Sequence, residues 1–420
     1  MPSAPGAPPF PSDGRRVSIP HLSREPAALG WFLVVAFLLN FGQGVYPPLL
    51  PELVGALGLS VAAAGLLGTA FGLPRALLGL SAGTLVERLG PTRMMHIGMA
   101  LVLAGTLVAV IASSLATMML ARGLAGLGYG ATAVVSIIYL MRAGDPHRRT
   151  RRGNMYECAL ITANAVSGYL AGAVSGSAGW RWGFGAAALA VGAGWLTAAW
   201  RVLPSVRTVF HERLAPAGGG VAPEPAPGAS PLALFAIYGV VFGLAFGWAG
   251  AITTLAPLYG GQALGLSAAA IGRALAIGYG VEAILLIPVG WAADTFGRLR
   301  VLLPGLATLL TGVVLLPLAG GLPGYTVACG LVIVGMTAWM IPASLLAEHL
   351  HGRFGGRAVG MYRFTTDLGM VGAPATVGWL TEWGGFGVGA AAVALVVATS
   401  GGVAGLVLGP RGRRPPRSVR

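Results

Sequence analysis

Long apolar stretches recur along the whole chain and are separated by short polar segments. Read with a window of about 19 residues, each stretch is long enough to cross a hydrocarbon layer about 30 Å thick as a helix. The pattern therefore predicts an all-α, polytopic membrane protein with about twelve transmembrane helices. The expected spans are residues 29–50, 61–82, 94–114, 116–141, 156–178, 183–203, 233–256, 268–291, 299–319, 323–347, 358–380 and 386–409.

An internal repeat divides these spans into two groups. A shift of 207 residues aligns residues 57–93 with residues 264–300 without a gap, and "LGLSVAAAG" then meets "LGLSAAAIG". The matched positions at the end of the repeat are Gly83 with Gly290, Glu87 with Asp294, Gly90 with Gly297 and Arg93 with Arg300. We therefore expect a disordered tail, a six-helix half, a flexible Pro- and Gly-rich linker, a second six-helix half and a basic tail, at residues 1–28, 29–203, 204–232, 233–409 and 410–420.

The basic residues predict the orientation in the membrane. All 27 of them are arginines, of which 22 fall in segments expected on one side and only Arg181 on the other. By the positive-inside rule both termini are expected in the cytoplasm, with the chain as a multi-pass protein of a bacterial plasma membrane. The densest cluster, residues 142–152, could also hold anionic lipid, although a plain orientation signal is favoured. Because the arginines are scattered over short loops, the net charge of +14 does not indicate a nucleic-acid partner.

The repeated segments "GTLVERLGPTR" and "GWAADTFGRLR" place an acid where a helix leaves the membrane. Glu87 and Asp294 can each lie near the positive end of a neighbouring helix, an interaction of about 0.3 to 1 kcal/mol when exposed. These acids could form a conformational latch between two states. The simpler alternative is that charged Gly-containing turns only terminate the helices.

The same residues resemble motif A of the major facilitator superfamily of secondary transporters. That motif joins helices 2 and 3, and it is matched by Gly83, Glu87, Arg88, Gly90 and Arg93, the last one position late. The second copy supplies Gly290, Asp294, Gly297, Arg298 and Arg300, and "LARGLAGLGYGA" places Arg122 and Gly126 in the R-x-x-x-G pattern of helix 4. The resemblance implies two six-helix halves that rock about a central site, with helices 2 and 11 facing one another between the halves.

Polar residues inside the expected spans are candidates for the site, because a charge at the bilayer centre costs at least about 2.5 kcal/mol. The deep charges are Arg75, Arg122, Glu282, Arg363 and Asp367. Asn40, Gln43 and Asn164 could form a substrate-binding cavity wall, since "NFGQGVYPPLLP" breaks helix 1 with Gly and Pro.

Other polar residues lie nearer the helix ends, where snorkelling to the interface is the favoured interpretation: Arg273, Glu157, Glu348 and His96. Four aromatic residues could line an apolar cavity, but the role we assign to them by default is helix packing or an aromatic belt at the membrane interface: Trp248, Tyr259, Trp339 and Tyr362.

Depth along the helices suggests one specific ion pair. Arg75 is expected roughly 12 Å and Asp367 roughly 13 Å from the cytoplasmic side. We therefore predict an ion pair between them that joins the halves. The competing interpretation is local, because Arg363 and Asp367 are spaced i,i+4 on one helix and could satisfy each other. Arg122, permanently charged, could tune the proton affinity of a nearby carboxylate, hold an anionic substrate or anchor helix carbonyls.

The favoured function is proton-coupled export of small organic or amphiphilic compounds by an antiporter that alternates its access. The alternatives are an uptake symporter for a sugar, an organic acid or another metabolite, and, in a different class, a membrane enzyme or a transport-dead receptor. ATP-driven pumping within this chain and hydrolysis are disfavoured because no GK[ST] loop, HExxH or Ser-His-Asp arrangement can be read in the sequence, and we expect that the protein is not an enzyme. We expect no catalytic residue, no metal and no cofactor beyond a proton gradient, with a small-molecule substrate, a lipid bilayer around the chain and a monomeric state.

Overall fold

The computed structural model describes residues 25–143, 149–211, 230–350 and 356–409, and every element in these segments is helical. The all-α prediction is therefore confirmed. The expected basic tail, most of the expected N-terminal tail and most of the linker lie outside the described residues.

The N-terminal half contains six membrane-crossing rods. The first consists of two helices because Pro47 and Pro48 lack the N–H groups that would continue α1 into α2. The sixth runs from α7 through a π-helical turn at Ala198–Val202 into α8. The helices are α1 (Glu25–Gly44), α2 (Tyr46–Leu57), α3 (Val61–Leu89), α4 (Pro91–Ile111), α5 (Leu115–Arg142), α6 (Arg149–Ala178), α7 (Trp180–Thr197) and α8 (Leu203–His211).

The C-terminal half repeats this arrangement. Its first rod bends through π-helical turns on either side of the short α10, and its fourth is divided into α13 and α14. The helices are α9 (Pro231–Gly250), α10 (Ala256–Leu258), α11 (Ala268–Phe296), α12 (Arg298–Leu315), α13 (Leu322–Gly335), α14 (Ile341–His349), α15 (Gly356–Gly384) and α16 (Phe386–Leu408).

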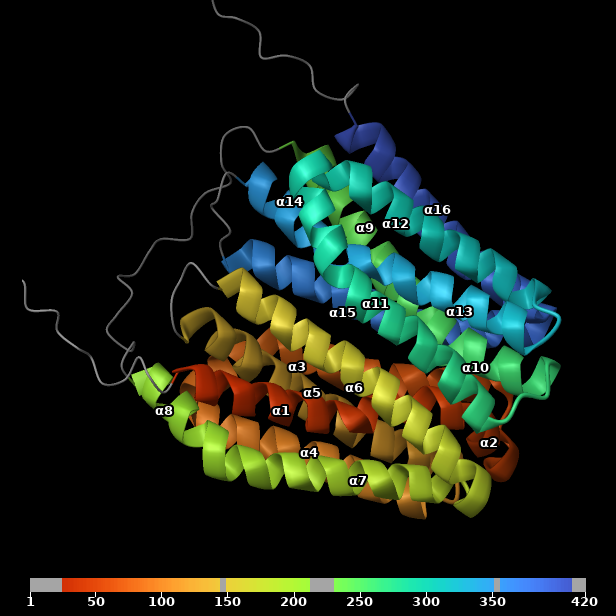
Figure 1. The fold of residues 1–420 in the computed structure, drawn as a ribbon, viewed down its shortest axis with the longest axis horizontal. Helices are drawn as coiled ribbons and strands as arrows, with labels where there is room; N and C mark the ends of the chain where they lie inside the picture. Colours follow the sequence, from red (N-terminus) through yellow and green to blue (C-terminus); the bar gives the residue numbers. More distant parts are fainter. Residues whose placement is uncertain (1–24, 144–148, 212–229, 351–355, 410–420) are drawn as a thin grey trace, which may run out of the picture.

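The expected count of about twelve spans agrees with these rods. Eleven helical stretches among the described residues are long and apolar enough to cross a membrane. The twelfth rod is α15, whose hydropathy is lowered by Arg363 and Asp367 in its middle. At 29 residues it is long enough to span, and it packs along α3 and α9 inside the bundle (Figure 1).

The sequence repeat is also a structural repeat. Helices α3 and α11 begin and end at positions that differ by 207 residues. Each begins after a serine cap, with Ser60 accepting a hydrogen bond from the Ala63 N–H at 3.2 Å and Ser267 accepting one from the Ala270 N–H at 3.3 Å. Each ends at a glycine with positive φ, 78° at Gly90 and 99° at Gly297. The duplicated glycines therefore set the helix ends, since other residues rarely adopt this backbone region.

The expected linker, residues 204–232, needs one correction at each end. Residues 204–211 are helical and belong to α8, while α9 already begins at Pro231. The side chains of Val206 and Phe210 are buried in the core of the N-terminal half. Two apolar residues four positions apart are enough to hold this short amphipathic helix against the bundle.

The two halves contact each other most closely at the end of the bundle where Arg181 lies. This end carries the short, arginine-free turn between α2 and α3 and its counterpart in the repeat, the turn between α10 and α11. Here α3 packs along α15 and α6 packs along α11 (Figure 1). A Cβ on Gly172 of α6 would collide with the carbonyl of Ala268, and one on Gly272 of α11 would lie 2.5 Å from the carbonyl of Gly168. These glycines therefore permit backbone contact between halves, as small residues do in other membrane helices.

A polar contact adds to this closure. The Glu382 carboxylate at the end of α15 accepts a hydrogen bond of 2.7 Å from the N–H of Ala62 in the first turn of α3. An acidic group at a helix N-terminus interacts favourably with the helix dipole and satisfies a free N–H group. One half of the molecule thus caps a helix of the other.

We predict that Gly172→Val opens this end of the bundle, because the new side chain cannot coexist with the Ala268 carbonyl. Spin labels at Ser177 and Gln262, which are exposed on opposite halves near this end, would report the change as a longer distance by pulsed electron paramagnetic resonance. Gly176→Val is the matched control, since a Cβ there meets nothing within 4 Å on the same helix. Equal label distances in the two variants would contradict the prediction.

Candidate functional site

A cavity of about 700 Å³ lies between the two halves. Its walls come from α1, α5 and α6 of the N-terminal half and from α11, α14 and α15 of the C-terminal half. The lining extends from Gln43 and Trp248 near the middle of the bundle to Met141 and Gly153, next to the arginine-rich loops. The cavity therefore reaches toward the arginine-rich end, whereas the opposite end is closed by the glycine contacts.

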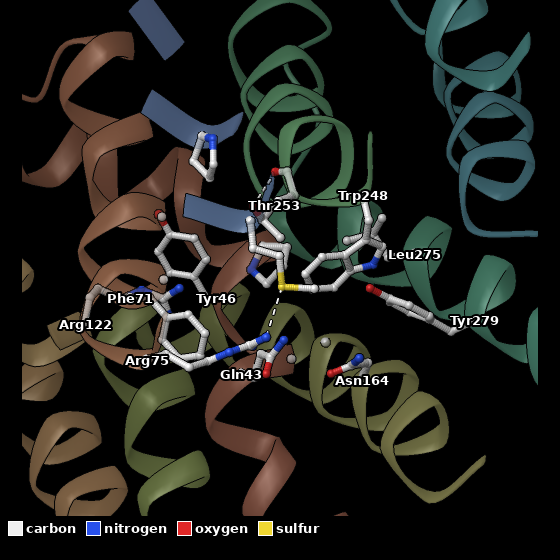
Figure 2. A pocket seen from close by; sticks show the side chains of 18 residues that line it. Gln43, Tyr46, Phe71, Arg75, Arg122, Asn164, Trp248, Thr253, Leu275 and Tyr279 are labelled. Carbon is white, nitrogen blue, oxygen red and sulfur yellow. Dashed lines mark hydrogen bonds between the residues drawn. The ribbon is translucent and has the colours of Figure 1, made fainter. Parts of the chain in front are cut away.

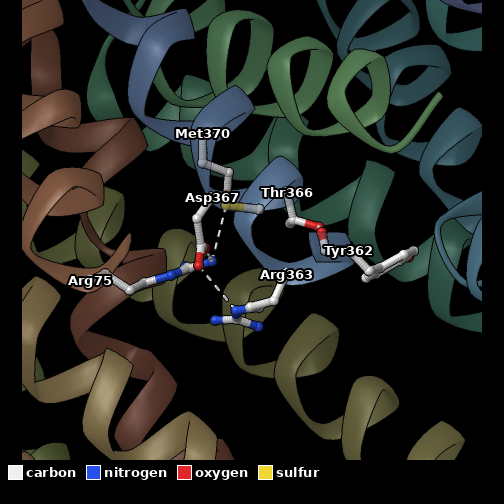
Figure 3. A network of polar contacts seen from close by, with 6 residues as sticks. All are labelled: Arg75, Tyr362, Arg363, Thr366, Asp367 and Met370. Atoms are coloured by element: carbon white, nitrogen blue, oxygen red, sulfur yellow. Dashed lines mark hydrogen bonds and ion pairs between the residues drawn. The ribbon is translucent and has the colours of Figure 1, made fainter. Parts of the chain in front are cut away.

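An ion-pair network crosses the interface beside this cavity (Figure 3). The Arg75 guanidinium of α3 lies 2.9 Å from one carboxylate oxygen of Asp367 on α15, and the Nε of Arg363 lies 3.1 Å from the other. The Asp367 side chain is 3% exposed, compared with 34% for Arg363. The predicted Arg75–Asp367 contact and the local alternative are thus both present, with one carboxylate shared between two guanidinium groups.

Two further carboxyl groups line the cavity without such partners. Glu157 projects from α6 and Glu282 from α11, so each half contributes one. Neither forms a hydrogen bond or ion pair within the described segments, although Glu282 is only 5% exposed. Glu282 was a predicted site residue. Glu157 was assigned to a helix end, and that interpretation is wrong because α6 begins at Arg149, two turns earlier.

The three predicted polar wall residues lie together at the part of the cavity that is near the middle of the bundle. The Asn40 amide of α1 donates to the carbonyl of Leu160 at 3.0 Å and to the side-chain oxygen of Asn164 at 2.8 Å, which ties α1 to α6. Gln43 and Asn164 line the cavity, and in the described residues the Gln43 amide makes no hydrogen bond. All three thus line the cavity, and Asn40 also links α1 to α6 through its hydrogen bonds.

Arg122 borders a smaller recess of about 40 Å³ (Figure 2), which shares Gln43 and Asn164 with the main cavity. Its guanidinium carbon lies 3.8 Å from the ring centre of Tyr46 and 4.5 Å from that of Phe71. Its Nε donates to the carbonyl of Leu67 at 3.4 Å, and Arg122 as a whole is 6% exposed. No described carboxylate pairs with it, so aromatic faces supply most of its stabilisation.

The motif A residues lie at the arginine-rich end, away from the cavity centre. Glu87 and Asp294 are exposed and make no hydrogen bond or ion pair in the described segments, and Arg88, Arg93 and Arg300 are exposed as well. Arg298 differs, because it pairs with Glu348 of α14 at 2.9 Å and also contacts the carbonyl of Ser344. Gly83 and Gly290 lie within α3 and α11, so they do not end these helices. In this conformation neither acid joins the two halves.

Aromatic side chains form more of the cavity wall than the sequence suggested. Trp248, Trp339 and Tyr362 line it, together with Tyr156 and Tyr279. Tyr259 does not, because its hydroxyl donates to the carbonyl of Ala319 at 2.8 Å within the core of the C-terminal half. Hydropathy cannot distinguish these positions, since an aromatic residue in a helix is equally suited to lipid, core or cavity.

Comparison with known proteins agrees with this architecture. The family model of the Major Facilitator Superfamily matches residues 32–347 and 237–420, so the chain belongs to that superfamily. It is accordingly a membrane transporter and not an enzyme. No curated protein sequence matches the chain.

Solved structures of peptide transporters share the fold. A structure of the peptide transporter POT in complex with sulfate has a TM-score of 0.68 at 16% identity, covering 91% of this chain and 94% of that one. A POT family transporter in complex with a thioalcohol-conjugated peptide has a TM-score of 0.72 at 12% identity, covering 92% and 97%. At these identities the likeness concerns the fold alone.

We predict that Arg75→Asp and Asp367→Arg each abolish transport, because each breaks the pair across the interface and puts two like charges beside one another at a buried site. Breaking a buried ion pair costs about 3 to 5 kcal/mol. The double swap should restore part of the transport rate, since it reinstates an opposite pair across the interface. Transport per molecule in membranes, normalised to the amount of inserted protein, is the measurement. A double variant no more active than the weaker single one, at normal expression, would reject the pair.

We also predict that Glu87→Asn and Asp294→Asn slow transport more than they weaken substrate binding. Both acids are free in the present conformation, so any helix-end contact they make stabilises the other state. A contact of about 0.3 to 1 kcal/mol corresponds to about a two- to fivefold change in rate. The exposed neighbour Thr295→Asn is the control. Equal rates in the wild type, both single variants and the double variant would show that neither acid is part of a latch.

Proposed function

We propose that this chain is a proton-coupled exporter of small organic or amphiphilic compounds, working as an antiporter by alternating access. The observation that carries the proposal is a largely apolar cavity with one carboxyl group from each half, Glu157 and Glu282, that pairs with no cation among the described residues. Apolar and aromatic walls suit an amphiphilic cargo.

The proposed orientation follows from the arginine distribution. With the arginine-rich end in the cytoplasm of a bacterial cell, the cavity faces inward and the glycine-packed end faces outward. This is the conformation in which an exporter loads its cargo. Rocking of the halves would then break the contacts of Gly172 and Gly272 and carry the cavity to the outside.

Proton coupling is assigned to the two free carboxyl groups. A carboxyl group that has no fixed cationic partner can bind a proton on one side of the membrane and release it on the other. Asp367 is unsuited to this role because two guanidinium groups hold it. Arg75 and Arg363 line the same cavity, but both are engaged with Asp367.

The site is complete within one chain, because both halves that form the cavity are covalently joined. We therefore propose that the monomer is the transporting unit. The cargo and protons are the only partners that the mechanism needs besides the bilayer.

The export proposal is tested with a deletion strain and an overexpressing strain of the host, screened against toxic compounds and radiolabelled metabolites with and without a protonophore. Export predicts that the deletion strain accumulates more of the cargo and that the protonophore removes the difference. Lower accumulation in the deletion strain would instead identify an uptake symporter.

We predict that Glu282→Gln and Glu157→Gln each abolish transport driven by a pH gradient, because the amide cannot carry a proton. In proteoliposomes with the cargo from the screen, uptake should fall to the level measured without a gradient, while cargo binding to the purified protein persists. Glu52→Gln on α2, outside the cavity, is the control. If both variants and their combination kept the gradient-driven rate, proton coupling would have to be assigned elsewhere.

A further inference from the structure

The recess around Arg122 has properties that neither the ion-pair network nor the two free carboxyl groups explain. We call it the apex recess, defined by Arg122, Gln43, Asn164, Thr253 and Trp248 among its lining residues. It lies between the halves at the inner limit of the main cavity, and the two spaces share Gln43, Asn164 and Trp248 as wall residues. A molecule in the main cavity can therefore reach into the recess.

The positive charge of Arg122 is not balanced within the described residues. Arg75 also borders the recess, but Asp367 neutralises it at 2.9 Å. Arg122 has no such partner, and its one hydrogen bond, to the carbonyl of Leu67, is long at 3.4 Å. A buried guanidinium has five N–H groups to satisfy, and stacking on Tyr46 and Phe71 uses its faces but not these edges. The unused N–H groups are available to an acceptor in the recess.

Two amide groups add further donors on the wall of the same recess. The side-chain oxygen of Asn164 already accepts a hydrogen bond from Asn40, which leaves its NH₂ group free to donate. The Gln43 amide makes no hydrogen bond in the described segments, and both side chains point into the space beside Arg75 and Tyr279 (Figure 2). One permanent cation and two neutral donors, with no carboxylate among the lining residues, favour a negatively charged ligand.

The size of the recess limits that ligand. At about 40 Å³ it accommodates about three waters, or one carboxylate group or one chloride ion, but not the body of an organic molecule. The adjoining cavity of about 700 Å³ can take an apolar body. The free carboxyl groups Glu157 and Glu282 line the main cavity and not the recess, so they do not compete for Arg122.

We propose that the apex recess is an anion subsite that binds the carboxylate of an amphiphilic organic acid, whose apolar body lies against the aromatic wall of the main cavity. The inference rests on the proposed function in that it names the class of cargo. Arg122 and the amides of Gln43 and Asn164 hold the carboxylate oxygens. Trp248 borders both spaces and contacts the first carbons of the apolar chain.

The test uses the purified full-length chain in lipid nanodiscs, with octanoate as the probe and octanol as the uncharged probe of equal chain length. Binding is followed by the intrinsic tryptophan fluorescence of the protein, to which Trp248 contributes, at constant ionic strength and without an added carboxylate salt. We expect octanoate to bind at least about tenfold more tightly than octanol, since a charge-assisted hydrogen bond contributes about 1.5 to 3 kcal/mol. Arg122→Gln should remove that difference, and Arg122→Lys should retain part of it.

Arg181→Gln is the matched control. Arg181 also stacks on an aromatic ring, 4.4 Å from the centre of Trp180, and donates to a carbonyl, that of Ala112 at 3.0 Å, but it does not line the recess. This variant should bind octanoate as the wild type does. The melting temperature of each variant in the nanodisc shows whether it is folded, and the Lys variant tests the charge even if the Gln variant is unstable.

Chloride distinguishes the two sources of a small anion. Competitive displacement of octanoate by chloride supports a shared anion subsite. Equal affinities for octanoate and octanol would overturn the proposal. If chloride nevertheless bound saturably, the recess would be a site for a small inorganic anion and not for the carboxylate of the cargo. Because the assay uses no gradient, the proposed function can fail while this subsite is confirmed, and export can be confirmed while the subsite fails.

Discussion

The arrangement of the two halves depends on the shared carboxylate of Asp367. A charge in the middle of a membrane bundle needs a partner, and Asp367 has two, one on its own helix and one across the interface. Because Arg75 belongs to the other half, the pair links the halves at mid-depth, while Arg363 keeps the carboxylate partnered if the halves separate. The network therefore allows a contact between halves to break without leaving an isolated buried anion.

The rest of the interface is built so that contact at one end excludes contact at the other. At the end near Arg181, Gly172 and Gly272 bring backbones together, and the Glu382 carboxylate caps α3 from the other half. Toward the arginine-rich end the same helices enclose the cavity, and the motif A acids make no hydrogen bond or ion pair with the described residues. Closing that end would require the glycine contacts to open, because α3, α6, α11 and α15 are long continuous rods that run through both regions.

Much of this arrangement could be predicted from the sequence, and the exceptions have identifiable causes. The 207-residue repeat predicts the correspondence of α3 and α11, and counting residues by helical rise predicts that Arg75 and Asp367 lie at matching depth. Glu157 was missed because hydropathy does not detect a helix that continues into an arginine-rich segment, as α6 does from Arg149. The free state of Glu282 and the aromatic stacking of Arg122 depend on which side chains meet across helices, which a single sequence does not specify.

Alternating access requires that the cavity be open to one side of the membrane at a time. Ile137 of α5 lines the cavity and is 45% exposed, so a cysteine placed there, in a chain with Cys158 and Cys329 replaced by Ala, samples that space. Its reaction with a membrane-impermeant thiol reagent should be compared in right-side-out and inside-out vesicles, with and without Gly172→Val. We predict rapid labelling from the cytoplasmic face alone, and a shift of labelling to the outer face when Gly172→Val is present. Equal labelling from both faces of the parent chain, or an unchanged pattern in the glycine variant, would contradict it.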